Sequence, residues 1–281
     1  GGGEGAVDWQ MNDHHRSTSY AILYELAHAK PSETAFIDIG LNIGWYSVQA
    51  GLLGFERIGV DMQPACIKYA RCNQELNQIG LGFTALNLAL SPVPDAPPVR
   101  IDAHSCTGGG SMSYGWGGAK VHVNVSSKHL GVVLNEWIAA TPARRNVDFI
   151  IKFDVEGFEP HLIQMLIDGG LLKKVKSLIV EMTPGNWPGQ GIADDKVSVF
   201  RPLMETLGFK AILLPQYMSS AMKTLLKDVP IDVLNNPCSL AWQEAGYAYP
   251  PSKFEDFRKR VFEHRLNDGT QTNWWFTHVT C

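Results

Sequence analysis

An α/β fold with a mostly parallel sheet is predicted by three features of this 281-residue sequence. Short apolar runs alternate with segments whose apolar residues recur at helical spacing, which is typical of βαβ units. Apolar residues make up 45% of the chain and charged residues 19%, so a large core can be buried. Two of the apolar runs end in Asp38 and Asp61, as is common at the carboxyl edge of a parallel sheet.

The elements of the core follow from these patterns in order. An N-terminal extension, residues 1–33, contains one predicted helix within Ser19–Ala29, because its apolar residues recur at helical spacing. The core spans 34–214, and Pro64 suits the first turn of one of its helices. The predicted strands are Ala35–Ile39, Arg57–Asp61, Gly82–Leu88, Asp148–Phe153, Ser177–Glu181 and Phe209–Leu214; the predicted helices are Ile43–Gly51, Pro64–Gln78, Leu130–Ala140, Pro160–Gly169 and Asp194–Leu207.

Two segments interrupt or extend this core. Residues 91–130 are predicted as an insertion, and its glycine-rich part Gly108–Gly118 is interpreted either as a substrate lid or as a plain connector. The C-terminal extension 215–281 is predicted to hold a helix at Phe254–Arg265 and an edge strand at Asn273–Val279. We therefore predict one domain with insertions over residues 1–281, not two domains.

Charge and cysteine content exclude several classes of protein. With 24 basic and 28 acidic residues the net charge is −4, which does not suit a protein that binds duplex nucleic acid. No transmembrane segment is predicted, since the most apolar stretch contains polar residues and four glycines. Five scattered cysteines without a CxxC motif do not form a disulfide scaffold, although a Cys238–Cys281 bridge is considered. The compartment stays open.

A glycine-containing turn follows the first predicted strand of the core. Asp38 lies near the end of that strand, followed by Gly40, Gly44 and a helix. Glycines let the backbone approach a ligand, and the helix N-terminus offers free N–H groups. The spacing is not the G-x-G-x-x-G of a dinucleotide site. An acid here repels a pyrophosphate and attracts an ammonium group, which favours a nucleoside that carries an amino acid.

A second acid, Asp61, ends the next predicted strand. A carboxylate at this position can accept both hydroxyl groups of a ribose. Taken alone, a glycine turn has a purely structural role about as often as it binds a ligand. A lone acid at a strand end is more often a helix cap than a ligand-binding group. In this order and at this separation, the two features together favour S-adenosylmethionine as the ligand.

Three carboxylates crowd the end of another apolar strand, in the sequence Lys152-Phe-Asp-Val-Glu-Gly-Phe-Glu159. Such crowding is costly unless a positive or proton-sharing group is present. The alternative is that Glu156 and Glu159 only face the dipole of the following helix. Glu181 ends the next predicted strand and is expected to lie beside Asp154.

Four segments together resemble the FkbM family of S-adenosylmethionine-dependent methyltransferases, and the resemblance covers about residues 34–214. Its most specific part is the Asp-x-Glu-Gly-x-Glu block. It implies a Rossmann-like class I methyltransferase fold, with a seven-stranded, mostly parallel sheet flanked by helices, and O-methylation of hydroxyl groups on natural products or glycans. The segments are Phe36-Ile-Asp-Ile-Gly-Leu-Asn-Ile-Gly-Trp-Tyr-Ser47, Asn73-Gln-Glu-Leu-Asn77, Asp148-Phe-Ile-Ile-Lys-Phe-Asp-Val-Glu-Gly-Phe-Glu159 and Ile179-Val-Glu181.

The resemblance implies a cofactor loop that contains Asp38, Gly40, Asn42 and Gly44. Leu41 stands where the family usually has alanine, and this bulkier side chain is expected beside the cofactor, where it would tighten or partly block the site.

Further residues receive roles in the same way. Asp61, followed by Met62, becomes the ribose acid, although the family more often has glutamate there. Asn87 and Ala89 are expected at the adenine. The residues expected to face the transferred methyl group and to catalyse its transfer are Asp154, Glu156 and Glu181.

Methyl transfer to an alcohol requires an aligned acceptor and a group that removes the proton. We expect Asp154 or Glu156 to be that base, with Glu181 tuning it. A divalent cation bound by Asp154 and Glu181 is an alternative that we do not favour.

Three functions are compared on this basis. The favoured one is an S-adenosylmethionine-dependent O-methyltransferase with a small-molecule or glycan acceptor. The second is a catalytically inactive, methyltransferase-like subunit that serves as a structural partner in a larger assembly. The presence of every acid and glycine of the expected site favours the enzyme. A nicotinamide-dependent dehydrogenase is disfavoured by the glycine spacing.

Overall fold

The computed structural model describes residues 13–93, 96–102, 106, 122–214, 248–268 and 272–278. The glycine-rich segment Gly108–Gly118 and the considered Cys238–Cys281 bridge lie outside these residues. Within the described ranges, no helix is both long enough and apolar enough to cross a membrane.

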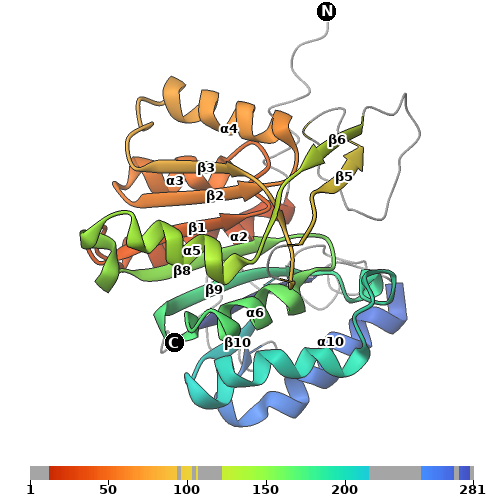
Figure 1. Cartoon of the computed structure of the whole chain (residues 1–281). Coiled ribbons are helices and arrows are strands. Elements are labelled where there is room, and N and C mark those ends of the chain that lie inside the picture. Colours follow the sequence, from red (N-terminus) through yellow and green to blue (C-terminus); the bar gives the residue numbers. More distant parts are fainter. Residues whose placement is uncertain are drawn as a thin grey trace, which may run out of the picture.

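An eight-stranded sheet in the order β11-β10-β12-β9-β8-β1-β2-β3 forms the centre of the molecule (Figure 1). Neighbouring strands from β9 to β3 are parallel, β12 is antiparallel to both β9 and β10, and β11 is antiparallel to β10. The predicted mostly parallel α/β fold is confirmed. There is one strand more than the seven expected, because the short β11 pairs with the outer edge of β10. The strands are β1 (Thr34–Ile39), β2 (Glu56–Asp61), β3 (Phe83–Asn87), β8 (Asp148–Asp154), β9 (Val175–Met182), β10 (Lys210–Leu214), β11 (Ala248–Tyr249) and β12 (Thr272–Thr277).

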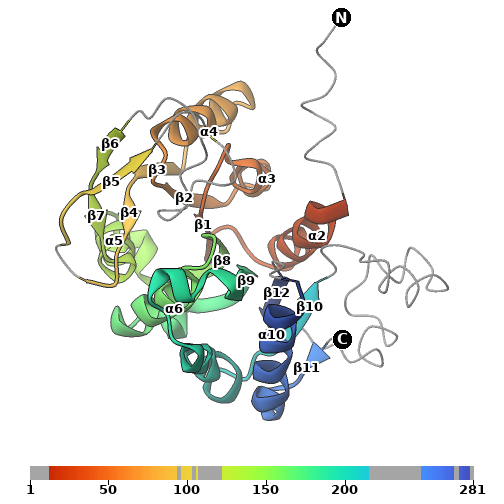
Figure 2. The ribbon, with the colours of Figure 1, turned by 90° about the vertical axis from the view of Figure 1, so that its right-hand side faces the viewer.

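Helices cover both faces of this sheet. Figure 2 shows α2, α3 and α4 on one face and α5 and α6 on the other. Two small two-stranded sheets, β4 with β7 and β5 with β6, lie outside the main one. The helices are α2 (Asp13–Ala27), α3 (Trp45–Leu52), α4 (Pro64–Leu76), α5 (Leu130–Ala139), α6 (Glu159–Asp168) and α10 (Phe254–Asp268), and the remaining strands are β4 (Ala89–Leu90), β5 (Val99–Asp102), β6 (His122–Val125) and β7 (Ser127–Lys128).

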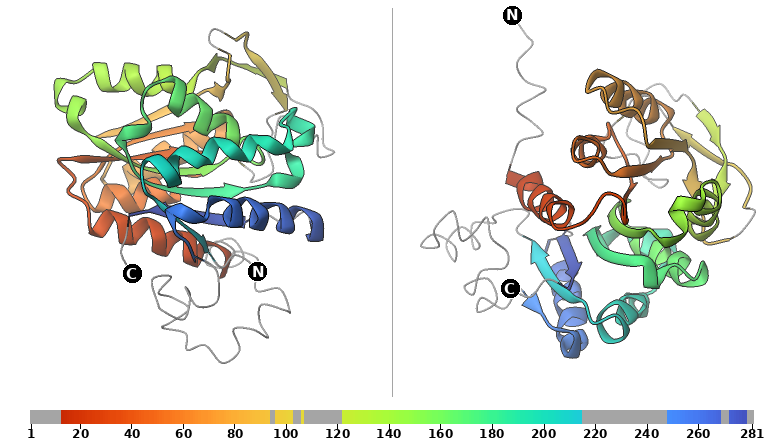
Figure 3. Two further views of the ribbon diagram at one scale, coloured as in Figure 1. Left: turned by 90° about the horizontal axis from the view of Figure 1, so that it is seen from below. Right: turned by 90° about the vertical axis from the view of Figure 1, so that its left-hand side faces the viewer.

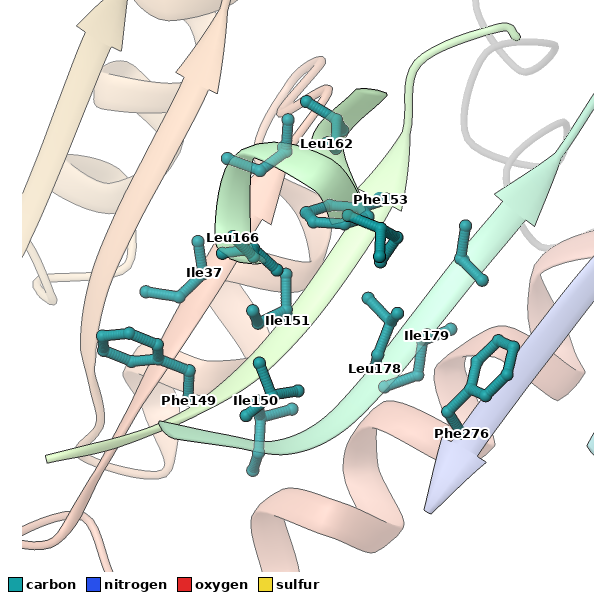
Figure 4. Packing of buried hydrophobic residues seen from close by; sticks show 14 of the residues in the cluster. Ile37, Phe149, Ile150, Ile151, Phe153, Leu162, Leu166, Leu178, Ile179 and Phe276 are labelled. Atoms are coloured by element: carbon teal, nitrogen blue, oxygen red, sulfur yellow. The ribbon is translucent and has the colours of Figure 1, made fainter. Parts of the chain in front are cut away.

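The core lies where the central strands meet these helices. Strand β8 is a nearly continuous apolar run, as expected of a parallel strand that is buried on both faces. Leu162 and Leu166 of α6 lie together with Ile151 and Phe153 of β8 in this core, and all four are fully buried (Figure 4).

The prediction of an edge strand near Asn273 is wrong in its placement. Strand β12 lies inside the sheet, between β9 and β10, next to α2 and α10 (Figures 2 and 3). Trp275 contacts Tyr24 of α2 with ring centroids 5.6 Å apart, whereas Trp274 and Phe276 contact Phe257 of α10 on the other face. The apolar side chains of β12 point to both faces, and α2 and α10 cover them, as is typical of a strand in the interior of a sheet.

The predicted helix Asp194–Leu207 is also different in the structure. It consists of a 3-10 helix, Asp194–Phe200, followed by a π-helical turn, Pro202–Thr206. The physical reason is Pro202, which lacks the N–H group that a continuous α-helix would need at this point.

A disulfide joins Cys66 at the start of α4 to Cys106 in the inserted segment. The sequence offered no reason to pair them, since 40 residues separate the two cysteines. Cys72 is a free, exposed cysteine.

Candidate active site

The turn after β1 lies at the point where strand order reverses, because β2 is on one side of β1 and β8 on the other. Gly40, Asn42 and Gly44 all have positive φ, between 51° and 78°. A Cβ on Gly40 would overlap the carbonyl oxygen of Asp154 at the end of β8. Glycine is therefore required here by both conformation and space, and the turn is in direct contact with β8.

Asp61 connects this turn to the end of β2. One of its carboxylate oxygens accepts from the Asn42 N–H at 2.9 Å and the other from the Gln63 N–H at 2.8 Å. Burial raises the pKa of Asp61, and these two hydrogen bonds oppose the rise. The Asn87 side-chain amide donates to the carbonyl oxygens of Asp61 and Met62, at 3.0 Å and 2.9 Å. These predicted cofactor residues therefore form one connected group.

Other predicted residues near the turn lie in small apolar clusters. Met62 packs with Ala89 against side chains of β5 and β6. Leu41 is 2% exposed and packs with Ile67 and Ala70 of α4. The expectation that Leu41 stands beside a cofactor is thus wrong: its side chain fills the core next to Gly59, where glycine leaves room for it.

Asp38 is fully buried, and its Oδ2 accepts a hydrogen bond of 2.8 Å from the Ser47 hydroxyl. Its Oδ1 has no hydrogen-bond donor among the described residues, and the Lys152 ammonium is 3.6 Å away. Burial raises the pKa of Asp38 to about 6, against the opposing effect of Lys152. The sequence argument expected a ligand to supply an ammonium group here, but the chain itself supplies one.

Lys152 is one of the site residues to which sequence reasoning gave no role. Its Nζ donates to the Gly40 carbonyl oxygen at 2.7 Å and is 3.2 Å from Asp154 Oδ2. Burial alone would lower the pKa of Lys152, but the charges of Asp154 and Asp38 outweigh it and hold the pKa above its usual value. The available signal was a lysine inside the otherwise apolar run of β8.

Asp154, Glu156 and Glu181 come together as a carboxylate cluster. Asp154 and Glu181 are partners in the register of β8 and β9. Together with Glu156, each contributes one oxygen to a group whose members all lie within 4.8 Å of one another. Burial, followed by the charges of Asp154 and Glu156, raises the pKa of Glu181 well above its usual value. The expected proximity of Asp154 and Glu181 is confirmed.

The loop that carries Glu156 is held from two sides. Glu156 and Gly157 have φ values of 55° and 107°, and the Asn186 side chain donates to the Glu156 carbonyl oxygen at 3.1 Å. Glu159, fully buried, accepts from the Gly157 N–H at 2.6 Å and from Trp187 Nε1 at 3.0 Å. Glu159 therefore fixes the turn and is not only a charge facing a helix dipole.

A small polar pocket opens beside the cluster. Segments distant in sequence contribute to it: Thr18 of α2 and Asn273 of β12, whose side chains form a buried hydrogen bond of 2.8 Å. No sequence pattern indicated these two residues, because only the position of β12 beside β9 brings them to the site. The pocket is lined by Thr18, Tyr46, Lys152, Phe153, Asp154, Ile179, Glu181 and Asn273.

No family model and no curated protein sequence matches the chain. Solved methyltransferase structures match the chain with TM-scores between 0.35 and 0.40. A SAM-dependent methyltransferase from Agrobacterium tumefaciens is 10% identical with a TM-score of 0.36, over 60% of this chain and 45% of that one. The bifunctional kinase-methyltransferase WbdD is 16% identical with a TM-score of 0.39, over 74% and 38%. The plantazolicin methyltransferase BamL, in complex with SAH, is 11% identical with a TM-score of 0.38, over 97% and 88%.

The chain thus spans less than half the length of the first two of these proteins.

Proposed function

We propose that the chain is an S-adenosylmethionine-dependent methyltransferase that methylates a hydroxyl group on a small molecule or glycan, as the resemblance to the FkbM family implies. The observation that carries this proposal is the direct contact between the turn after β1 and the carboxylate cluster after β8. Gly40 and Asp154 meet with no room for a Cβ. A nucleoside bound at the turn would have its reactive end next to groups that can accept a proton.

The residues at the turn fit such a cofactor. Each oxygen of Asp61 accepts one backbone N–H group, and a carboxylate oxygen has a second lone pair that can accept a ribose hydroxyl. The partly buried Met62 offers apolar surface for the base, Ala89 packs beneath it with 3% exposure, and Gly40, Asn42 and Gly44 shape the turn. Asp38 is fully buried, so it acts on the cofactor through the loop and Lys152.

S-adenosylmethionine supplies an electrophilic methyl group when bound. An acceptor oxygen would take this methyl group in exchange for its proton, with the electrons of the broken carbon–sulfur bond left on sulfur, and a carboxylate of the cluster would receive the proton. The chain must align the acceptor and take this proton. The pocket beside the cluster, with Thr18 and Asn273 as hydrogen-bonding groups, is where we place the acceptor hydroxyl.

Among the three carboxylates, Glu156 fits the base best. Asp154 is already engaged by the Lys152 ammonium, 3.2 Å from its Oδ2. The raised pKa of Glu181 keeps a proton on this side chain to higher pH, where it can donate a hydrogen bond. Glu156 is half-buried at the rim of the cluster, on a loop fixed by Asn186.

A divalent cation in the carboxylate cluster is the rival arrangement, since its oxygens are close enough to share one ion. The two arrangements give different results with a chelator. We expect turnover to be insensitive to it, whereas a loss of activity that added magnesium or manganese restores would favour the cation.

The test of the proposal is calorimetric titration of the full chain with S-adenosylmethionine. We expect micromolar binding, and loss of binding in Asp61→Ala. Glu56→Ala is the matched control, because Glu56 is a paired carboxylate at the opposite end of the same strand. Absence of binding by folded wild-type protein would overturn the proposal and favour a structural subunit with a protein partner.

A further inference from the structure

The Lys152 ammonium joins the two halves of the proposed site. Its three N–H groups have three oxygens around them: the Gly40 carbonyl at 2.7 Å, Asp154 at 3.2 Å and Asp38 at 3.6 Å. Gly40 and Asp38 belong to the turn after β1 and its strand, and Asp154 to the carboxylate cluster. With a side chain 5% exposed, Lys152 has no solvent to compensate its charge.

Four carboxylates surround the contact between the turn after β1 and the carboxylate cluster, so a cation at this contact changes the net charge of the site. Asp38, Asp154, Glu156 and Glu181 lie around the contact between the turn and the cluster. Carboxylates near a sulfonium ion stabilise the bound cofactor more than the transition state, in which the positive charge is already leaving the sulfur. A cluster needed for proton removal therefore carries the risk of holding the cationic cofactor too tightly. A fixed positive charge between Asp38 and Asp154 reduces that risk.

We propose that Lys152 is a positioning residue that fixes the Gly40 turn against Asp154 and whose charge limits the preference of the site for the cationic cofactor over its neutral product. This inference rests on the proposed function. It differs from a purely structural role in one measurable respect. The ratio of the affinities for the cationic cofactor and for its neutral product, and not only their magnitude, depends on the charge at position 152.

The experiment compares S-adenosylmethionine and S-adenosylhomocysteine, which differ by one methyl group and one positive charge. Their dissociation constants are measured by calorimetry for wild type, Lys152→Gln and Lys152→Arg. For a unit charge removed close to the sulfonium, Coulomb's law gives a change of at least about twofold in the ratio even at the dielectric constant of water. We expect Lys152→Gln to shift preference toward S-adenosylmethionine by this factor, and Lys152→Arg to keep the wild-type ratio.

Lys174→Gln is the matched control. Lys174 also donates to backbone carbonyl oxygens, those of Arg145 and Val147, but at the opposite end of β8. Its removal should leave the ratio unchanged. If Lys152→Gln does not fold, Asp38→Asn is compared with Asp38→Asn/Lys152→Gln. These two proteins differ only in the lysine, and neither leaves a buried Asp38 charge unpaired.

The outcomes separate the two proposals. If folded wild-type protein binds neither ligand, the proposed function fails and this inference fails with it. If wild type binds both and the loss of Lys152 weakens both affinities by the same factor, the proposed function stands and Lys152 is only structural. A ratio that moves toward the neutral product would also overturn the inference.

Discussion

Asp154 and Glu181 face each other on the parallel strands β8 and β9, with one carboxylate oxygen of each within 4.8 Å of the other. Two acids at such a distance do not ionise independently. The surroundings divide the two acids: Asp154 forms an ion pair with the Lys152 ammonium, whereas burial and the neighbouring acids raise the pKa of Glu181.

From this division we predict that Glu156→Gln lowers turnover by about a hundredfold or more, the usual contribution of a general base. Affinity for S-adenosylmethionine should fall by a smaller factor than turnover, since the substitution keeps size and shape and removes one negative charge of the cluster. Turnover is measured under saturating cofactor once an acceptor is identified, with Glu136→Gln, an exposed glutamate on α5, as the control. Full turnover by Glu156→Gln would exclude it as the base.

Gly40→Ala should destabilise the fold by about 2–4 kcal/mol. A left-handed backbone conformation costs a non-glycine residue about 1–2 kcal/mol, and overlap with the Asp154 carbonyl oxygen adds a steric cost of similar size. Gly170→Ala isolates the first effect, because Gly170 also has positive φ but open space around it. Urea unfolding measures both. Equal losses in the two variants would contradict the close contact at Gly40.

We predict that the free energy of unfolding depends on pH through the buried side chain of Glu159. Burial raises its pKa in the folded protein from 4.5 to about 7. The folded state therefore holds the proton more tightly than the unfolded state, so this contribution to stability is present in full below pH 4.5 and is lost as the pH rises through 7. The shift corresponds to about 3 kcal/mol.

Glu159→Gln removes this titration. Urea unfolding at pH 5 and pH 8 should show a smaller loss of stability in the variant than in wild type. Glu75→Gln, an exposed position on α4, should behave as wild type does. Identical pH dependence in all three proteins would show that Glu159 does not titrate in this range.

Reduction of the Cys66–Cys106 disulfide should destabilise the protein. The bond closes a loop with a sequence separation of 40, for which chain entropy gives a stabilisation of up to about 4 kcal/mol. We expect Cys66→Ala/Cys106→Ala to lose stability and to become insensitive to reductant, whereas Cys72→Ser stays like wild type. A double variant as stable as wild type in oxidising buffer would contradict the prediction.

Local patterns predicted much of the fold, and contacts between distant segments account for what they missed. Strands β1, β2, β3, β8, β9 and β10 follow from apolar runs, whereas the short strands β4 to β7 were not predicted. The turn at Gly40 and the cluster at Asp154 follow from acids and glycines at strand ends. Strand propensity does not say which strands β12 pairs with. The uninterrupted apolar run Trp274-Trp275-Phe276 is typical of a strand buried on both faces, and this pattern could have indicated an interior position. The sequence argument for an ammonium beside Asp38 was sound, but it assigned to a ligand the charge that Lys152 provides.

The position of β12 has a consequence for the order in which the molecule can assemble during synthesis. Strand β10 is complete at residue 214, yet the strand that joins it to β9 is made only after residue 271. Until then β9 has an open edge, which is a template for pairing with other chains. Contacts between such distant segments form slowly. The pocket that includes Asn273 therefore exists only after translation of almost the whole described chain, and a nascent chain held before that point should need protection at this edge.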